Sequence, residues 1–442
     1  MKNKLFALSL FFCLTACGGG GSDSNETTSP PVQAVDSDSD GVPDTADNCQ
    51  NLSNPEQEDK DSDNIGDACD PAVAFKIPNP AGDIPNGQYS QFDLSDDGRF
   101  VAFVYASLEP NLPEKTSSNI YLFYIESEET ILVSSTSTGD TPNDISDHVL
   151  ISNDGRFVYY ESLASDIVGG EKGVRKIIRF DSQNQVNELI PYDYEMYEVS
   201  QFANSGAALG SASVSNDGYK LCLQSDIRVN TRIQTTNAVF DTTSQTVSQP
   251  KFYGTCGEFV DSDNLLYVVS DENLVYEDGG HGTGNLFSID LVTGDYVPLF
   301  DESAFANLTR PSVLYGDSSP DGNFIVALVR NHNTNGGFSV GQLFLINKLD
   351  NTVTLVVNGD EINPAPPLWP ARISDDGKYI YSHSTKLEVS TATVTPLFEN
   401  TEFEGLISHF PLDTSSDGRR VVVGTEPFPN KELVVLLLKP DS

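Results

Sequence analysis

Closely spaced acidic residues dominate the stretch from Asp36 to Asp70, which reads DSDSDGVPDTADNCQNLSNPEQEDKDSDNIGDACD. Carboxylates at this density can bind hard cations such as Ca2+, whose preferred ligands are oxygens. The stretch has one Lys, no Arg and very few apolar residues, so it cannot form a hydrophobic core of its own. It is therefore either a solvated acidic linker or a segment that folds around metal ions.

The spacing of these carboxylates follows the ligand pattern of an EF-hand calcium loop, twice over. The first loop would use Asp36, Asp38, Asp40, the carbonyl of Val42, Asp44 and Asp47 as ligands. The second loop would use Asp59, Asp61, Asp63, the carbonyl of Ile65, Asp67 and Asp70. Gly41 allows the sharp turn of the first loop, and Asn64 replaces it in the second because Asn tolerates the left-handed conformation. A solvated linker would not explain two loops in register, so the pattern favours Ca2+ as the cofactor.

The same stretch resembles the thrombospondin type 3 repeat. No flanking helices are visible, which argues against an EF-hand protein, whereas Asn48-Cys49, Asn54-Pro55, Gln57 and the ending Gly66-Asp67-Ala68-Cys69-Asp70 match that repeat. The resemblance implies that residues 36–70 wrap calcium with Asp side chains and backbone carbonyls. It also implies a disulfide bond between Cys49 and Cys69.

The N-terminus carries the features of an export signal. Lys2 and Lys4 precede the apolar run LFALSLFFCL, which has the length of a signal-peptide core. The following Leu-Thr-Ala-Cys resembles the lipobox of bacterial lipoproteins, which implies a signal peptide at 1–16, lipidation of Cys17 and a flexible tether at 17–35. Gly18 after the Cys favours anchoring at the outer membrane, on its periplasmic or surface-exposed side. The alternative is an ordinary secretory signal with an incidental Cys.

The rest of the chain repeats itself. Six Ser-x-Asp-Gly sequences end at Gly98, Gly155, Gly218, Gly322, Gly377 and Gly418, and an alternating apolar run follows each one. Asp-Gly before such a run is a strong hairpin signal. Asp263-Asn264 replaces it in a seventh unit, and a second strand pair follows in most units. Seven units of four antiparallel strands predict an all-β, seven-bladed β-propeller over residues 72–442.

The last unit stops after its third strand, and the stray sequence VAFKI at 73–77 could supply the missing outer strand. This pairing would close the ring. The repeated turn and strands resemble the TolB-like and WD40-like propellers of periplasmic proteins, a resemblance that implies a fold and hardly any activity. Cys222 and Cys256 fall on neighbouring blades, where they would form a second disulfide in an oxidising compartment or remain two buried thiols.

Five histidines are predicted to share the face that carries the longest loops. They are His148, His281, His332, His383 and His409. Binding surfaces usually belong to long loops on a rigid scaffold, so this is the predicted binding face. A metal held by these histidines, as in propeller-fold oligogalacturonate lyases, is an alternative, but no paired ligand spacing supports it.

Composition limits the possible partners. The formal net charge of -40 disfavours nucleic acid and anionic lipid surfaces, so the membrane would be contacted through the lipid anchor only. No catalytic constellation is recognised, which favours a propeller that binds a protein or peptide in the cell envelope, displayed on a calcium-braced stalk. The alternative is a propeller-fold enzyme, a polysaccharide lyase or hydrolase that acts through the long-loop face.

Overall fold

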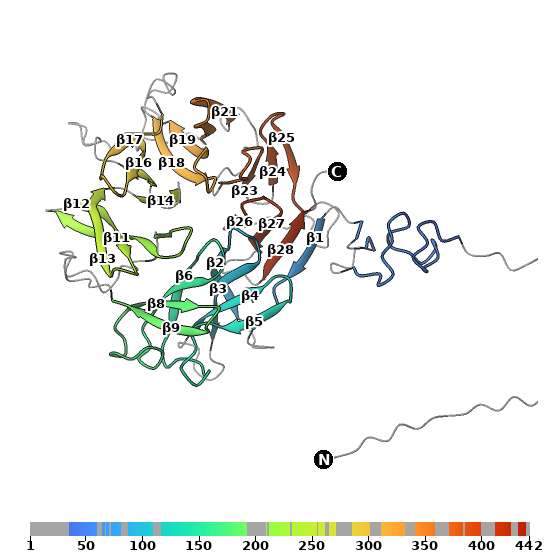
Figure 1. Cartoon of the computed structure of the whole chain (residues 1–442), viewed down its shortest axis with the longest axis horizontal. Coiled ribbons are helices and arrows are strands. Elements are labelled where there is room, and N and C mark those ends of the chain that lie inside the picture. The colour runs from blue at the N-terminus through green and yellow to red at the C-terminus, as the bar shows by residue number, and fades with distance from the viewer. Residues whose placement is uncertain are drawn as a thin grey trace, which may run out of the picture.

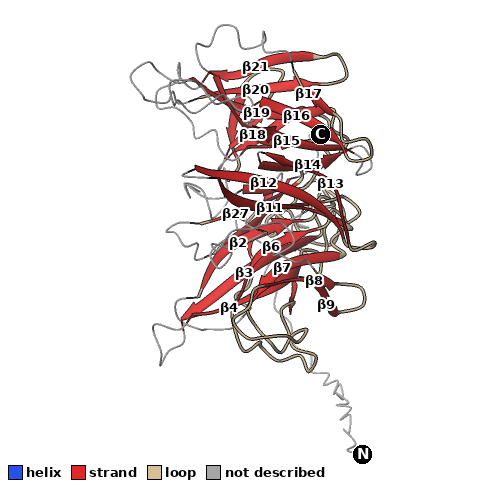
Figure 2. Ribbon diagram, turned by 90° about the vertical axis from the view of Figure 1, so that its left-hand side faces the viewer, coloured by secondary structure: helices blue, strands red, loops and turns tan. Residues whose placement is uncertain are grey.

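Strands and loops make up the described part of the chain. The computed structural model describes residues 35–59, 64–66, 68–69, 72–80, 87–108, 116–191, 209, 212–229, 232–253, 255–260, 265–270, 285–300, 311–331, 341–358, 371–382, 385–398, 412–425 and 432–438. Within these ranges the regular elements are all β-strands (Figure 2). The same ranges contain no helix of the length and hydropathy needed to span a membrane.

The repeated Ser-x-Asp-Gly sequences form one kind of turn. In the first, Ser95 Oγ donates to Asp97 Oδ1 at 2.7 Å and accepts from the N–H of Phe100 at 3.1 Å. Gly98 has a φ of 69°, which Gly adopts without steric cost, and its N–H donates to the Ser95 carbonyl. The same contacts recur in the turns that begin at Ser152, Ser215, Ser319, Ser374 and Ser415. Each turn joins the two inner strands of one sheet.

Seven four-stranded antiparallel sheets, the blades, are arranged in a ring (Figure 1). We call the space between their inner strands the central channel. Blade 1 contains β2 (Gln88–Leu94), β3 (Phe100–Leu108), β4 (Thr116–Tyr124) and β5 (Glu129–Leu132). Blade 2 contains β6 (Ser146–Ile151), β7 (Phe157–Ser162), β8 (Lys176–Asp181) and β9 (Val186–Ile190). Blade 3 contains β10 (Ser213–Val214), β11 (Lys220–Val229), β12 (Arg232–Asp241) and β13 (Thr246–Tyr253).

The remaining blades follow the same order. Blade 4 contains β14 (Thr255–Val260), β15 (Leu265–Ser270), β16 (Asn285–Asp290) and β17 (Tyr296–Pro298). Blade 5 contains β18 (Pro311–Ser318), β19 (Phe324–Asn331), β20 (Gln342–Asn347) and β21 (Thr352–Asn358). Blade 6 contains β22 (Ala371–Ile373), β23 (Tyr379–Ser382), β24 (Thr385–Glu388) and β25 (Thr393–Pro396). Blade 7 contains β26 (Leu412–Thr414), β27 (Arg420–Gly424), β28 (Leu433–Leu438) and β1 (Ala72–Lys76). The predicted all-β, seven-bladed propeller is confirmed.

Strand β1 closes the ring. It pairs antiparallel with β28, from Ala72 opposite Leu438 to Lys76 opposite Val434. Figure 1 shows blue β1 beside red β28, so the two ends of the propeller meet in one sheet. The predicted outer strand from the N-terminal side is therefore confirmed. Its Ala74 is fully buried, which fixes the strand against its neighbours.

Apolar side chains fill the space between successive blades. The described residues form seven hydrophobic clusters, one between each pair of neighbouring blades. A disulfide joins Cys222 on β11 to Cys256 on β14, with a Cα–Cα distance of 6.0 Å, and so links blades 3 and 4. The scaffold thus holds its inner strands in fixed positions around the channel.

Strand direction gives the propeller two distinct faces. The Ser-x-Asp-Gly turns and the turns between the two outer strands lie on one face, which we call the turn face. The other connections lie on the opposite face, which we call the loop face. The N–H of Leu438 donates to the carbonyl of Arg419, the residue directly after a Ser-x-Asp-Gly turn, so the paired Ala72 also lies at the turn face. The acidic segment therefore joins the propeller on the turn face, beside blade 7 (Figure 1).

Candidate functional sites

Three carboxylates of the first acidic loop converge. One oxygen from each of Asp36, Asp38 and Asp40 lies within 4.8 Å of the others. The Asp36 carboxylate also accepts hydrogen bonds from the N–H groups of Ser39, at 2.8 Å, and Gly41, at 3.1 Å. Gly41 has a φ of 101°, a conformation that the loop requires and that Gly adopts readily. The sequence therefore folds locally into a loop with its carboxylates turned inward.

The second acidic loop repeats this geometry where it is described. Asp59 Oδ2 accepts from the N–H of Asn64 at 3.1 Å, the counterpart of the contact between Asp36 and Gly41. Asn64 has a φ of 74°, as expected for a residue in the place of Gly. Ile65 follows in the described part of this loop. The remaining predicted ligands lie outside the described residues: Asp61, Asp63, Asp67 and Asp70.

Both acidic loops have carboxylate oxygens without a protein partner. Among the described residues, Asp38 Oδ2, Asp47 Oδ2 and Asp59 Oδ1 are buried and receive no hydrogen bond. Asp47 is only 8% exposed. Burial of an anionic oxygen is costly unless a donor or cation compensates it. Partial desolvation and the neighbouring carboxylates raise the pKa of Asp38. These orphaned oxygens fit a cation that supplies the missing charge.

Not every predicted ligand joins the convergent group. Asp44 accepts from the N–H and the hydroxyl of Ser37, at 2.7 and 2.8 Å, and lies outside the cluster of three. Asp47 Oδ1 accepts from the N–H of Cys49 at 2.8 Å, which leaves its other oxygen orphaned. The structure thus brings together the carboxylates of Asp36, Asp38 and Asp40, and no carboxylate oxygen of Asp44 or Asp47 joins that group. The ligand role of the Val42 carbonyl stays a prediction.

A polar network replaces the hydrophobic core of the acidic segment. The side chain of Asn54 donates to Asn48 Oδ1 at 2.7 Å, and the side chain of Gln57 donates to Asn54 Oδ1 at 3.0 Å. The N–H of Gly66 donates to the Asn48 carbonyl, and a Cβ at Gly66 would lie 2.3 Å from Asn48 Oδ1. A disulfide joins Cys49 to Cys69 across this network. The two acidic loops are therefore held together by amides and a covalent bond.

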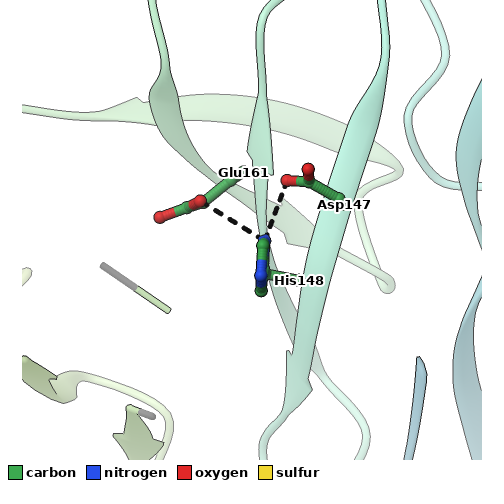
Figure 3. A group of neighbouring side chains, drawn as sticks. All are labelled: Asp147, His148 and Glu161. Atoms are coloured by element: carbon green, nitrogen blue, oxygen red, sulfur yellow. Dashed lines mark hydrogen bonds and ion pairs between the residues drawn. The ribbon is translucent and has the colours of Figure 1, made fainter. Parts of the chain in front are cut away.

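His148 is the one predicted face histidine within the described ranges. It occupies a β-bulge in β6 with a φ of 52°, and its side chain meets Asp147 and Glu161 (Figure 3). His148 Nδ1 lies 3.0 Å from Asp147 Oδ1 and 3.5 Å from Glu161 Oε2. Burial raises the pKa of Glu161, which is fully buried. The pKa of Asp147 is lowered: burial alone would raise it, but His148 and Arg175 outweigh that effect.

Arg175 neutralises this cluster. Its Nη1 lies 2.7 Å from Asp147 Oδ1 and 2.6 Å from Glu161 Oε2, so a guanidinium already bridges the two carboxylates. The other Glu161 oxygen accepts from the N–H of Leu209 at 3.1 Å. A metal ion at this point would have to displace Arg175. The arrangement suits orientation of His148 and proton exchange at its ring better than metal binding.

A second group of charges lines a cavity in the central channel. This cavity of about 190 Å³ lies among the last residues of the inner strands and the Ser-x-Asp-Gly turns, and hence at the turn face. Five carboxyl groups and one guanidinium line it: Asp93, Asp96, Glu258, Asp317, Asp413 and Arg372. It lies at the other end of the channel from the predicted binding face.

Three of these carboxylates accept hydrogen bonds from the neighbouring blade. Asp413 Oδ2 accepts from the N–H of Leu94 in blade 1, and Asp93 Oδ2 accepts from the N–H of Ile151 in blade 2, both at 2.8 Å. Asp317 Oδ2 accepts from the N–H of Ile373 in blade 6 at the same distance. Each bond crosses from one inner strand to the next, so these residues fix the spacing of the inner strands.

The enclosed position of this group perturbs its acids. Burial raises the pKa of Asp93, and the adjacent Asp413 raises it further. Burial also raises the pKa of Asp96 and Glu258. Burial raises the pKa of Asp317 to about 8, although Arg372 opposes this change. Arg372 itself stays charged, because Asp413 and Asp317 outweigh the effect of burial. The cavity therefore concentrates acids that ionise reluctantly.

Sequence reasoning missed this cavity. The sequence signal for the cavity is a charged residue two positions before the Ser of a Ser-x-Asp-Gly turn, at the end of the strand that leads into that turn. Asp93, Asp317, Arg372 and Asp413 all hold that position. The predicted lipidation site Cys17 and the other four face histidines, His281, His332, His383 and His409, lie outside the described residues.

Comparison with known proteins identifies one family match. Residues 35–57 match the thrombospondin type 3 repeat. A search of curated proteins finds no match to this chain.

Solved structures share the fold. An oligogalacturonate lyase in complex with manganese is 12% identical, with a TM-score of 0.52 over 83% of this chain and 93% of its own. The oligogalacturonate lyase of Vibrio parahaemolyticus is 10% identical, with a TM-score of 0.53 over 83% of this chain and 94% of its own. The acylaminoacyl peptidase of Pyrococcus horikoshii is 12% identical, with a TM-score of 0.52 over 78% of this chain and 50% of its own. At these identities the likeness shows the propeller fold alone.

Proposed function

We propose that this protein is a calcium-binding protein of the cell envelope, in which a calcium-stabilised segment displays a propeller that binds a protein or peptide. The observation that carries the calcium proposal is the set of orphaned carboxylate oxygens beside the convergent Asp36, Asp38 and Asp40. Thrombospondin type 3 repeats bind calcium in general, and residues 35–57 match that repeat. In the first loop, these three carboxylates and Asp47 would hold the ion.

Calcium would neutralise the acidic segment and order it. Its carboxylates repel one another without a cation, and its core is polar, so little apolar burial opposes unfolding. Bound ions would convert that repulsion into attraction. Because Cys69 lies just before Ala72, the first residue of β1, an ordered segment would also hold a defined position at the turn face.

Calorimetric titration of the whole protein with calcium tests this function. Asp38→Asn should weaken calcium binding at least tenfold, since it removes the charge of a ligand whose Oδ2 has no protein partner. Glu56→Gln is the matched control, because Glu56 is an exposed acid of the same segment outside the ligand pattern. Equal affinity in the two variants would contradict the assignment.

The envelope location and the partner are tested separately. Metabolic labelling with a fatty acid should mark the wild-type protein but not Cys17→Ser if the chain is a lipoprotein. Cross-linking in envelope extract, with calcium or with chelator, should then capture a defined protein partner. Loss of the partner in chelator would link its binding to the acidic segment. No label on the wild-type protein would overturn the anchor, and no captured partner would overturn the binding role.

An enzyme remains the second candidate, and the His148 cluster is the observation that favours it. A histidine hydrogen-bonded to a carboxylate, beside a second carboxylate and a guanidinium, has the groups needed for acid–base catalysis. Assay against oligogalacturonate and acylated peptides would test it. Turnover that disappears in His148→Gln supports an enzyme, and turnover that survives this change removes the cluster from the reaction.

A further inference from the structure

The turn-face cavity contains more carboxyl groups than the hydrogen bonds between blades require. Asp93, Asp317 and Asp413 each accept an inter-blade hydrogen bond. No such bond accounts for the carboxyl groups of Asp96 and Glu258, which have no hydrogen bond to another described residue. Both nevertheless line the cavity. The hydrogen bonds between blades therefore do not explain why Asp96 and Glu258 line the cavity.

The guanidinium of Arg372 shows that the cavity can hold an organic cation beside its carboxyl groups. Its Nε lies 2.9 Å from Asp413 Oδ1 and its Nη1 lies 3.9 Å from Asp317 Oδ1. It is the sole cationic side chain among the described residues that line the cavity. One guanidinium therefore faces five carboxyl groups. It forms ion pairs with Asp317 and Asp413, and it also interacts electrostatically with Glu258.

Ser213 is a second and independent sign of a missing ligand. It lines the same cavity, is 8% exposed, and its hydroxyl has no hydrogen-bond partner in the described part of the chain. Ser213 lies two residues before a Ser-x-Asp-Gly turn, and Asp413 and Arg372 hold the equivalent position in their own blades. All three residues line the cavity. A buried hydroxyl without a partner costs free energy that a polar ligand could recover.

The geometry favours an organic cation over a metal ion. Calcium needs several oxygens at about 2.3–2.6 Å, and hence close to one another. No three of these carboxylates bring their oxygens within 4.8 Å of one another, although the described residues include all five. Ammonium and guanidinium groups carry several N–H donors that reach acceptors spaced more widely. A volume of about 190 Å³ suits a small alkylated cation.

We propose that the turn-face cavity binds an organic cation, a guanidinium or primary ammonium group, through Asp96, Glu258 and Ser213. The group could belong to a free small molecule or to a basic side chain of a peptide. This site is independent of the calcium segment and of the loop face.

Calorimetric titration of the calcium-saturated whole protein tests the proposal. The probes are N-methylguanidinium, n-butylammonium and a short capped peptide with one Arg. We expect saturable binding with one site per chain, weakened at least tenfold in Glu258→Gln and in Asp96→Asn. Glu129→Gln is the matched control, because it removes the same charge from an exposed position on β5. Unchanged melting temperatures would show that the variants remain folded.

The probes also separate the two sources of the cation. Tighter binding of the peptide than of N-methylguanidinium supports a peptide source, and the reverse order supports a free small molecule. Equal weakening in all three variants would mean general charge attraction and would overturn the site. Loss of probe binding with magnesium, together with saturable magnesium binding that Glu258→Gln abolishes, would overturn it in favour of a metal site.

Discussion

Phe75→Ala tests whether β1 closes the propeller. Phe75 is 9% exposed and belongs to the cluster between blades 7 and 1, where its ring lies 6.4 Å from that of Phe123. Truncation of a buried Phe to Ala typically costs about 3–5 kcal/mol. Because β1 covers the edge of β28, we expect a loss of about 3 kcal/mol for the whole propeller.

Equilibrium unfolding in urea, followed by circular dichroism, would measure this loss. Val394→Ala is the matched control, because Val394 also lies on an outer strand, β25, but is 48% exposed. We expect the control to lose less than about 0.5 kcal/mol. An uncovered β28, with the sequence LVVLLL, should also promote association of chains through its free edge. If Phe75→Ala and Val394→Ala are equally stable, β1 does not hold the ring closed.

Three further predictions concern other parts of the molecule. Gly66→Ala should weaken calcium binding, since its Cβ would clash with Asn48 Oδ1, and calcium titration would detect this; an unchanged affinity would contradict the packing. Asp317→Asn should reduce the pH dependence of stability between about pH 4 and 8. Burial raises the pKa of Asp317 to about 8, so the folded state keeps a proton that the unfolded state has released, and stability falls as pH rises, by at most about 1.4 kcal/mol per pH unit. Urea unfolding at several pH values would measure this, and identical slopes in variant and wild type would refute it. Replacing Cys222 and Cys256 by Ala should cost about 3–4 kcal/mol of propeller stability, since the bond closes a loop with a sequence separation of 34, and calorimetry would reveal no change if the bond does not form.

The propeller could be predicted because its signals are local and repeated. A Ser-x-Asp-Gly turn depends on contacts within only six residues, as the contacts of Ser95 with Asp97 and Phe100 show. Alternation along each following strand then sets its register. The strand that closes the ring could also be predicted, because the last unit lacked an outer strand and residues 73–77 were not assigned to any other unit.

The clustering of the acidic residues in the turn-face cavity could not be predicted in this way. Asp93 and Asp413 are far apart in the sequence, and only closure of the ring brings blade 7 beside blade 1. Arg372 looks like an ordinary polar residue of a short strand until Asp317 and Asp413 surround it. Similarly, the hydrogen bonds from Ser37 to Asp44 could not be predicted from loop spacing, because they depend on how the chain entering the loop is folded.

Reduction of the disulfides gives the most direct test of the calcium account. The Cys49–Cys69 bond lies within the acidic segment, and the Cys222–Cys256 bond lies between blades and serves as an internal control. We expect calcium to slow reduction of Cys49–Cys69 at least tenfold, measured by mass spectrometry after thiol labelling, and to leave Cys222–Cys256 unchanged. Equal rates for Cys49–Cys69 with calcium and with chelator would contradict a segment that folds around calcium.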